Sequence, residues 1–215
     1  MKTILLKDAA ALIPDGASVM IGGFMGVGTP ERLVDELVRQ GRRNLTVIAN
    51  DNAIPGIGIG KLISAGAVKK TIASHIGLNP ETQKKMLAGE LEVDLVPQGT
   101  LIERIRAGGF GLGGVLTPTG VGTVVEKGKQ RIEVEGKPYL LETALRADFA
   151  LVQAFLADYI GNLYYALTAR NFNPVIAMAA DTVIVEADNI VPVGVIAPDQ
   201  VVTPAPVVDY IISHA

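Results

Sequence analysis

The sequence contains no cysteine and only two histidines, His75 and His214, among its 215 residues. Without cysteine, the chain has no disulfide framework and no thiolate ligands for a metal. Two histidines do not provide the histidine cluster of a zinc or non-haem iron site. We therefore expect no metal centre. Any chemistry must rely on carboxylates, amides, hydroxyls and the backbone.

The chain also lacks an excess of positive charge. Its 19 basic and 22 acidic residues give a net charge of −3, whereas nucleic-acid-binding proteins present a basic face. No segment approaches the roughly 18 uncharged apolar residues of a transmembrane helix. Lys7 and Asp8 interrupt the apolar segment near the N-terminus before a signal peptide can form. We expect a cytoplasmic protein that binds neither nucleic acid nor membranes.

Apolar residues are nevertheless abundant, at 49% of the chain. They belong either in buried parallel strands or on a surface that a partner subunit covers. Short apolar segments alternate with helical patterns, which predicts one α/β domain over residues 1–215. Because most of these segments are continuously apolar, we expect three layers, with helices on both faces of a mainly parallel central sheet. The expected strands are 18–22, 45–50, 68–74, 93–97, 149–154, 182–185 and 207–212.

Three helices are predicted from the residues at their ends. The first opens at Thr29-Pro30-Glu31, with a capping residue, a proline suited to the first helical position and an acidic residue at the positive end. Gly41 ends it. Residues 79–89 carry the same signals, and a third helix ends at Gly108-Gly109. Alternating polar and apolar residues over 131–140 predict a β-hairpin.

A glycine-rich segment separates the first predicted strand from the first predicted helix. Its glycines allow the backbone to approach a ligand closely, and the following helix offers N–H groups to an anion. Open α/β sheets bind ligands at this carboxyl end of their strands. The candidate binding residues are Gly22, Gly23, Phe24, Met25, Gly26, Val27 and Gly28.

Two other interpretations of this segment stay open. One is a tight strand-to-helix turn without a ligand. The other is a dinucleotide site with Asp51 as the ribose-binding carboxylate, although the spacing Gly-Gly-x-x-Gly-x-Gly differs from Gly-x-Gly-x-x-Gly. That second pattern occurs at residues 109–114, but after a helix instead of a strand, so it is not interpreted as a nucleotide site. Residues 108–122 are expected to form a mobile or substrate-lining loop, or a passive surface loop.

Gln98 follows an apolar strand and precedes a helix. A side-chain amide at this place can donate a hydrogen bond to an oxyanion, and the alternative is a solvated residue at an ordinary helix N-terminus. Asn50-Asp51-Asn52 either stabilises its own turn or faces the same crevice. His75 adjoins Ser74, but neighbouring strand residues point to opposite faces, so we expect a structural or substrate-lining histidine. The aromatic segment 159–165, with residues 170–174, packs either against a partner chain or internally.

Together these segments resemble the alpha subunit of a family I coenzyme A transferase of the acetate–acetoacetate or butyrate–acetoacetate type. The resemblance extends from residue 15 to residue 204 and implies the NagB/RpiA/CoA transferase-like α/β fold. It rests on Asp15-Gly16, Val19-Met20-Ile21, Gly22-Gly23-Phe24, Gly28-Thr29-Pro30, Pro97-Gln98-Gly99-Thr100-Leu101, Glu103-Arg104-x-Arg106-Ala107-Gly108-Gly109, Thr117-Pro118-Thr119-Gly120, Asn171-Phe172-Asn173-Pro174 and Thr203-Pro204.

The resemblance implies a ping-pong transfer of coenzyme A between carboxylic acids. A glutamate attacks the acyl thioester, and coenzyme A, a substrate and not a resident cofactor, is then held as an enzyme thioester. In the family this glutamate lies in a Ser-Glu-Asn-Gly motif of the beta subunit, and the motif is absent here. Glu142, the acidic residue with the most apolar neighbours, has no glycine turn to present it. The resemblance thus implies a beta partner, in an assembly of two alpha and two beta subunits.

By the same resemblance, Gln98 is an oxyanion-hole donor and residues 22–28 bind coenzyme A. Water must be excluded from the reactive anhydride and thioester, which an apolar subunit interface would achieve. Two alternatives remain: a sugar-phosphate isomerase of the related fold, acting through its own carboxylate, and a non-catalytic regulator that binds coenzyme A. Acyl-chain preference and the roles of His75, Asn50 and Asp51 are not predicted.

Overall fold

The computed structural model describes residues 2–213. The α-helices are α1 Leu6–Ala11, α2 Glu31–Arg39, α3 Ile59–Ser64, α4 Pro80–Leu87, α5 Gln98–Gly109 and α6 Asn173–Ile176. The strands are β1 Lys2–Ile4, β2 Ser18–Ile21, β3 Leu45–Asp51, β4 Val68–His75, β5 Glu92–Leu95, β6 Gly114–Thr117, β7 Arg131–Val134, β8 Lys137–Thr143, β9 Ala147–Asp158, β10 Leu163–Tyr164, β11 Ala180–Val191 and β12 Tyr210–Ile212.

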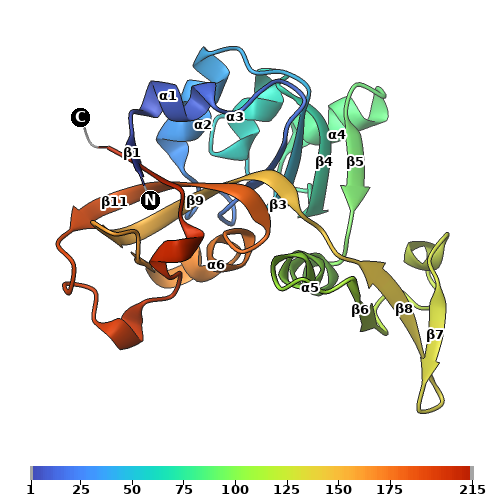
Figure 1. Cartoon of the computed structure of the whole chain (residues 1–215). Coiled ribbons are helices and arrows are strands. Elements are labelled where there is room, and N and C mark those ends of the chain that lie inside the picture. The colour runs from blue at the N-terminus through green and yellow to red at the C-terminus, as the bar shows by residue number, and fades with distance from the viewer. Residues whose placement is uncertain (1, 214–215) are drawn as a thin grey trace.

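The main sheet has the strand order β1-β12-β11-β9-β2-β3-β4-β5 (Figure 1). All neighbours on this path are parallel, and β10 pairs with β9 in the antiparallel direction. The central register places Val19 of β2 opposite Val47 of β3 on one side and Phe149 of β9 on the other. The predicted mainly parallel α/β sheet is confirmed.

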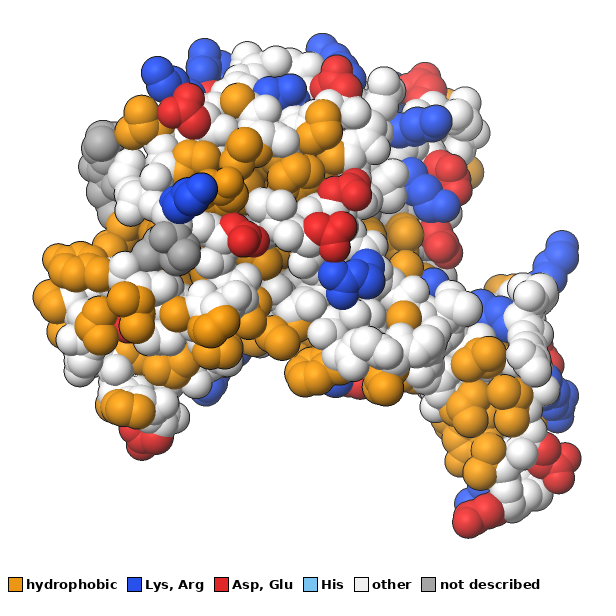
Figure 2. Space-filling view, in the orientation of Figure 1, with side chains coloured by type: hydrophobic (Ala, Val, Ile, Leu, Met, Phe, Trp, Pro, Cys, Tyr) orange, Lys and Arg blue, Asp and Glu red, His pale blue; other side chains and the backbone are white. Residues whose placement is uncertain are grey.

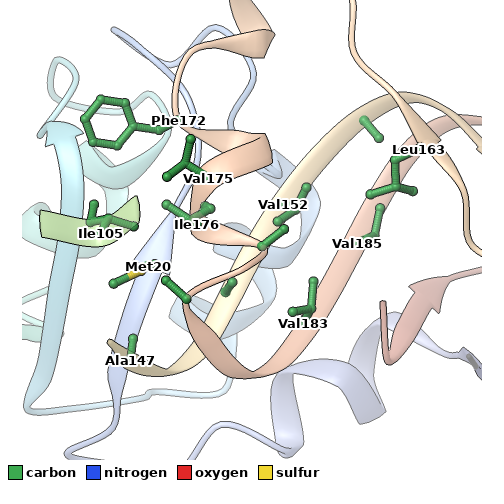
Figure 3. Close-up of a cluster of buried hydrophobic side chains, with 14 of the residues drawn as sticks. Met20, Ile105, Ala147, Val152, Leu163, Phe172, Val175, Ile176, Val183 and Val185 are labelled. Atoms are coloured by element: carbon green, nitrogen blue, oxygen red, sulfur yellow. The ribbon is translucent and has the colours of Figure 1, made fainter. Parts of the chain in front are cut away.

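Both faces of the sheet are buried. Val19 and Ile21 of β2 pack with α1, α2 and α3 in one core, whereas Met20 between them packs with α5 and α6 in the other. Figure 3 shows this second core, in which Ile105 of α5 and Ile176 of α6 lie over Met20 and Val152. Burial on both faces is the reason why these strands are continuously apolar in the sequence.

Some predicted elements differ from the structure. The strand expected at 93–97 is β5, which lies at an edge of the sheet with Leu95 half exposed, so it is not central. The strand expected at 207–212 is shortened to β12, because a 3-10 helix occupies Ala205–Val207. Pro204 and Pro206 have no N–H to donate to a neighbouring strand, which explains the late start.

A second, three-stranded antiparallel sheet of order β6-β8-β7 forms an arm that projects from the main body (Figure 1). The hairpin predicted over 131–140 is confirmed as the β7–β8 turn. The arm carries exposed apolar side chains, among them Leu116, Val124 and Val134, and Figure 2 shows an apolar area on it. Glu142 lies in this arm, 2% exposed, and forms ion pairs with Lys129 and Arg104.

The expectation of a mobile, substrate-lining or passive surface loop over residues 108–122 is wrong for its first part, which contains the end of α5 and strand β6. A Cβ atom on Gly108 would lie 2.0 Å from the Leu145 carbonyl oxygen, and one on Gly114 would lie 2.4 Å from that of Glu142. These glycines therefore permit close backbone packing. Over residues 2–213, no helix is both long and apolar enough to cross a membrane.

Candidate active site

The candidate site lies where the strand order of the main sheet changes direction. The chain adds β3, β4 and β5 on one side of β2, then β9, β11 and β12 on the other. Open α/β sheets bind ligands at such a switch point, beyond the carboxyl ends of the strands. We define the candidate site as loop 22–28 after β2, Asn50 and Asp51 of β3, Ser74 of β4, Gln98 of α5, and Asn171.

Loop 22–28 is a small hairpin. Phe24 and Val27 exchange two backbone hydrogen bonds of 3.0 Å, and Met25 and Gly26 between them have φ angles of 51° and 86°. Positive φ at both central positions is typical of a type I′ turn, for which glycine is favoured. The side chains of Phe24, Met25 and Val27 are exposed. The hairpin thus presents apolar side chains at its tip.

Three buried side chains fix this loop. The Asp51 carboxylate accepts the Met25 N–H at 3.0 and 3.2 Å. The Thr29 hydroxyl donates to the carbonyl oxygen of the first loop residue at 3.0 Å, and the Asn173 amide donates to that of the last at 2.8 Å. All three residues are at most 5% exposed. Both ends of the loop and its turn are therefore bonded to buried side chains, while its tip stays exposed.

Two loop glycines are required by close contacts. A Cβ on Gly22 would lie 1.8 Å from Oδ1 of Asn173, and one on Gly26 would lie 2.4 Å from Cγ2 of Ile57. Real Cβ atoms do not approach neighbours this closely, so either substitution forces its surroundings to shift. The glycines thus let the loop pack against residues from two other segments of the chain.

The N-terminus of α2 is not free to bind an anion, contrary to the expectation from the sequence. Thr29 was expected to be the N-cap residue of this helix. The N-cap position is instead occupied by Pro30, and the Thr29 hydroxyl bonds the loop. The Glu186 carboxylate of β11 instead accepts the N–H groups of Arg32 and Leu33, at 3.2 and 2.9 Å. A protein carboxylate thus occupies the place where a ligand phosphate would bind. The signal for this was absent from the local sequence, because Glu186 comes about 150 residues later.

Gln98 is the first residue of α5 and is exposed. Its Nε2 donates a hydrogen bond of 2.9 Å to Oδ1 of Asn50, which is fully buried. A primary amide has two N–H groups, so this bond orients the Gln98 side chain and leaves its second N–H for a ligand. Gln98 is therefore not simply solvated.

Asn50 connects the remaining polar groups of the site. Its Nδ2 donates to Oδ1 of Asn171 at 2.9 Å. The Ser74 hydroxyl lies 2.7 Å from the Asn50 carbonyl oxygen and 2.9 Å from its Oδ1. Ser74 is thus bonded to Asn50 and not to its neighbour His75, which is exposed at the end of β4. Sequence reasoning did not identify Ser74 or Asn171 as parts of this site, since their link runs through Asn50.

The three residues of Asn50-Asp51-Asn52 have different roles. Asn50 bonds Gln98, whereas Asp51 accepts the N–H groups of Met25 and of Ala53, the latter at 2.6 Å. Asn52 accepts the Thr71 hydroxyl at 2.9 Å within the core. The dinucleotide interpretation therefore loses its ribose-binding carboxylate, because Asp51 is used within the protein.

Other residues singled out in the sequence lie elsewhere. Tyr165 is buried, and its hydroxyl lies 2.7 Å from that of Thr203, whereas Tyr159 is exposed. Burial raises the pKa of Tyr165 above its usual value, which keeps its hydroxyl neutral. Within residues 2–213, no group of three or more His, Cys, Asp or Glu side chains is placed to hold a metal ion. His214 lies outside the described residues.

The comparisons agree with this architecture. The model of the coenzyme A transferase family matches residues 3–214. The chain is 59% identical over 211 residues to the acetate CoA-transferase subunit alpha of Escherichia coli, covering 98% of this chain and 96% of that protein. It is 53% identical over 213 residues to the acetoacetyl-CoA:acetate/butyrate CoA transferase alpha subunit of Clostridium acetobutylicum, covering 99% and 98%.

Among solved structures, the fold matches an acyl-CoA transferase of E. coli O157:H7 determined as a thioester complex with CoA. The TM-score is 0.87 at 23% identity, and the match covers 98% of this chain but 46% of that one. The chain thus spans less than half of that protein. The chain belongs to the coenzyme A transferase family. Both of these relatives are named as alpha subunits.

Proposed function

We propose that this chain is the alpha subunit of a short-chain coenzyme A transferase. It acts with a beta subunit to move coenzyme A between acetoacetyl-CoA, or a similar acyl-CoA, and acetate or a related carboxylate. Coenzyme A is the substrate, and the active assembly contains two alpha and two beta subunits. The observation that carries the proposal is the Gln98 amide, held by buried Asn50 at 2.9 Å beside the glycine-rich loop, in a chain with close relatives of this activity.

The attacking glutamate belongs to the beta subunit. The carboxylates near the candidate site in this chain are already used: Asp51 bonds two backbone N–H groups and Glu186 bonds two more. Hydrogen bonds to a carboxylate stabilise its charged form, which makes these carboxylates weaker nucleophiles. The partner's glutamate therefore attacks the thioester carbonyl, the coenzyme A thiolate leaves, and an acyl-glutamyl anhydride forms.

Gln98 stabilises the oxygen of the tetrahedral intermediate in this attack. Its second N–H donates to the developing oxyanion, while its first N–H stays bonded to Asn50. The returning thiolate then attacks the glutamyl carbonyl, which gives an enzyme thioester and releases the first carboxylate. The acceptor acid reverses both steps.

Loop 22–28 contributes to coenzyme A binding through its exposed tip. Phe24, Met25 and Val27 present apolar surface there, and the anion-binding role of the α2 N-terminus is taken by Glu186. We therefore assign the loop to the apolar part of the substrate, or to the covering beta subunit, and not to its phosphates. Coverage of this surface also excludes water from the anhydride.

Reconstitution with a separately purified beta subunit tests the proposal. We expect no transfer of coenzyme A from acetoacetyl-CoA to acetate by either subunit alone, and full activity on mixing. Gln98→Ala should preserve assembly and lower kcat by ~100- to 1,000-fold, as for loss of one oxyanion donor. Transfer by the isolated chain would refute the partner's role, and an unchanged kcat would refute that of Gln98.

Gly26→Val tests the loop. The added side chain meets Ile57 at a Cβ distance of 2.4 Å, so the hairpin or the Ile57 side chain must shift. We expect coenzyme A affinity to fall. Gly41→Val is the matched control, because Gly41 also has positive φ, 69°, but a Cβ there meets nothing within 4 Å. Calorimetric titration of the assembled enzyme measures both. Equal affinity in the two variants would place coenzyme A elsewhere.

A further inference from the structure

Asn171 lies in a turn that is anchored on both sides. Its own N–H donates to the Thr168 carbonyl at 3.0 Å. Two residues later, Asn173 is fully buried and donates to Ala169 at 2.9 Å and to the last carbonyl of loop 22–28 at 2.8 Å. The backbone of Asn171 is therefore fixed, although its side chain is at an exposed position.

From this turn, Asn171 orients the buried Asn50 amide together with the Ser74 hydroxyl, which lies 2.9 Å from Oδ1 of Asn50. Oδ1 of Asn171 accepts from Nδ2 of Asn50 at 2.9 Å. An amide has one donor end and one acceptor end, so this bond directs the oxygen of Asn50 toward Gln98, where it accepts Nε2 at 2.9 Å. If the Asn50 amide turned over, two NH₂ groups would face each other and the Gln98 bond would be lost.

We propose that Asn171 is a positioning residue for the transferase reaction, acting through Asn50 on the Gln98 amide. The inference rests on the oxyanion role of Gln98 in the proposed function. Asn171 needs no contact with substrate for this, because the essential feature is an acceptor oxygen at its Oδ1. Two residues of the segment Asn171-Phe172-Asn173 thus have separate roles. Asn171 orients Gln98 through Asn50, and Asn173 holds loop 22–28.

Two substitutions separate the acceptor from the shape of the side chain. Asn171→Ala removes the acceptor at an exposed position, so it creates no buried cavity. Losing one partner of a buried polar group corresponds to a decrease of about tenfold in kcat. Asn171→Asp retains an oxygen that can accept from Asn50, and we expect its kcat within about threefold of the parent. Thr168→Ala is a control in the same turn: it keeps the backbone carbonyl that accepts the Asn171 N–H, and we expect its kcat to be unchanged.

The experiment measures kcat and KM for each variant in the reconstituted enzyme, with thermal unfolding as a check of folding. We expect Asn171→Ala to lower kcat without changing the KM for coenzyme A thioester, and Asn171→Asp to restore it. In a Gln98→Ala background, Asn171→Ala should have no further effect, because the residue acts through Gln98.

Three results would overturn the inference: an unchanged kcat in Asn171→Ala, an Asp variant as slow as the Ala variant, or effects of Asn171→Ala and Gln98→Ala that multiply. The failure of the proposed function looks different. If Gln98→Ala itself keeps full kcat, the oxyanion role of Gln98 is wrong, and the positioning role of Asn171 is rejected with it. If Gln98→Ala lowers kcat and Asn171→Ala does not, only the positioning role of Asn171 is rejected.

Discussion

Two strand-to-helix connections border the candidate site, and they are built in opposite ways. The connection from β2 to α2 contains loop 22–28, which packs closely against Asn173 and Ile57. The connection from β5 leads directly to Gln98 and Gly99, the first two residues of α5, and both are exposed. A Cβ on Gly22 would meet an atom at 1.8 Å, whereas one on Gly99 would meet nothing within 4 Å.

This difference indicates that loop 22–28 has a structural role, whereas Gln98 takes part in the chemistry. Loop 22–28 depends on steric fit and on buried hydrogen bonds, so its substitutions should act on stability and on ligand affinity. Gln98 depends on a single side-chain bond to Asn50, so its removal should act on the rate of the chemical step. Substitutions in the two connections should thus be distinguishable by what they change, and not only by how much.

Gly22→Ala should have the largest structural effect. Gly22 does not have a positive φ, so the whole effect comes from the clash of the new methyl group with Asn173. Overpacking of this kind destabilises by about 1–3 kcal/mol, and for a chain of this size each kcal/mol lowers Tm by about 2–4 °C. Thermal unfolding measures the loss. We expect coenzyme A affinity to fall with it.

The matched comparison for Gly22→Ala is Gly99→Ala measured under the same conditions. A Tm of Gly22→Ala equal to that of the parent would mean that Asn173 moves aside without loss of stability. The loop would then be adaptable, and the contrast between the two connections would fail.

Asp51→Asn should have an effect of similar size. The substitution keeps the shape of the side chain, but an NH₂ group replaces one oxygen that accepts a backbone N–H of Met25 or Ala53. Hydrogen bonds to a charged acceptor contribute about 1.5–3 kcal/mol each. We expect faster amide hydrogen exchange at Met25 and weaker coenzyme A binding with kcat nearly unchanged. A fall in kcat alone would assign Asp51 to the chemistry instead of the scaffold.

Local patterns in the sequence predicted the fold well. Both faces of β2, β3 and β9 are buried, so their continuous apolar runs gave the parallel sheet directly. The cap at Asn79 was predicted and is present, with its side chain accepting the Thr82 N–H at 3.0 Å. The short helix α3 was missed because it follows glycine-rich residues and has only 6 residues, fewer than two turns.

The candidate site was less predictable, because its order depends on contacts between distant residues. The glycines marked the loop and the helix start marked Gln98. However, Asn173 bonds the loop and Glu186 bonds the N-terminus of α2, each from more than 140 residues away. Neither has a local signal that assigns it to the site. The prediction that the N-terminus of α2 is free to bind an anion was wrong because Glu186 occupies it.

Gly99→Ala should have the smallest effect of all. Gly99 lies in the first turn of α5, and the new methyl group meets nothing within 4 Å. Alanine favours the helix over glycine by about 0.8–1 kcal/mol in helix interiors, so stability should stay equal or rise slightly. We expect kcat within about twofold of the parent in the reconstituted enzyme. A large loss of kcat with normal assembly would mean that substrate approaches the α5 backbone itself, so that this connection would also be a place where glycine is required.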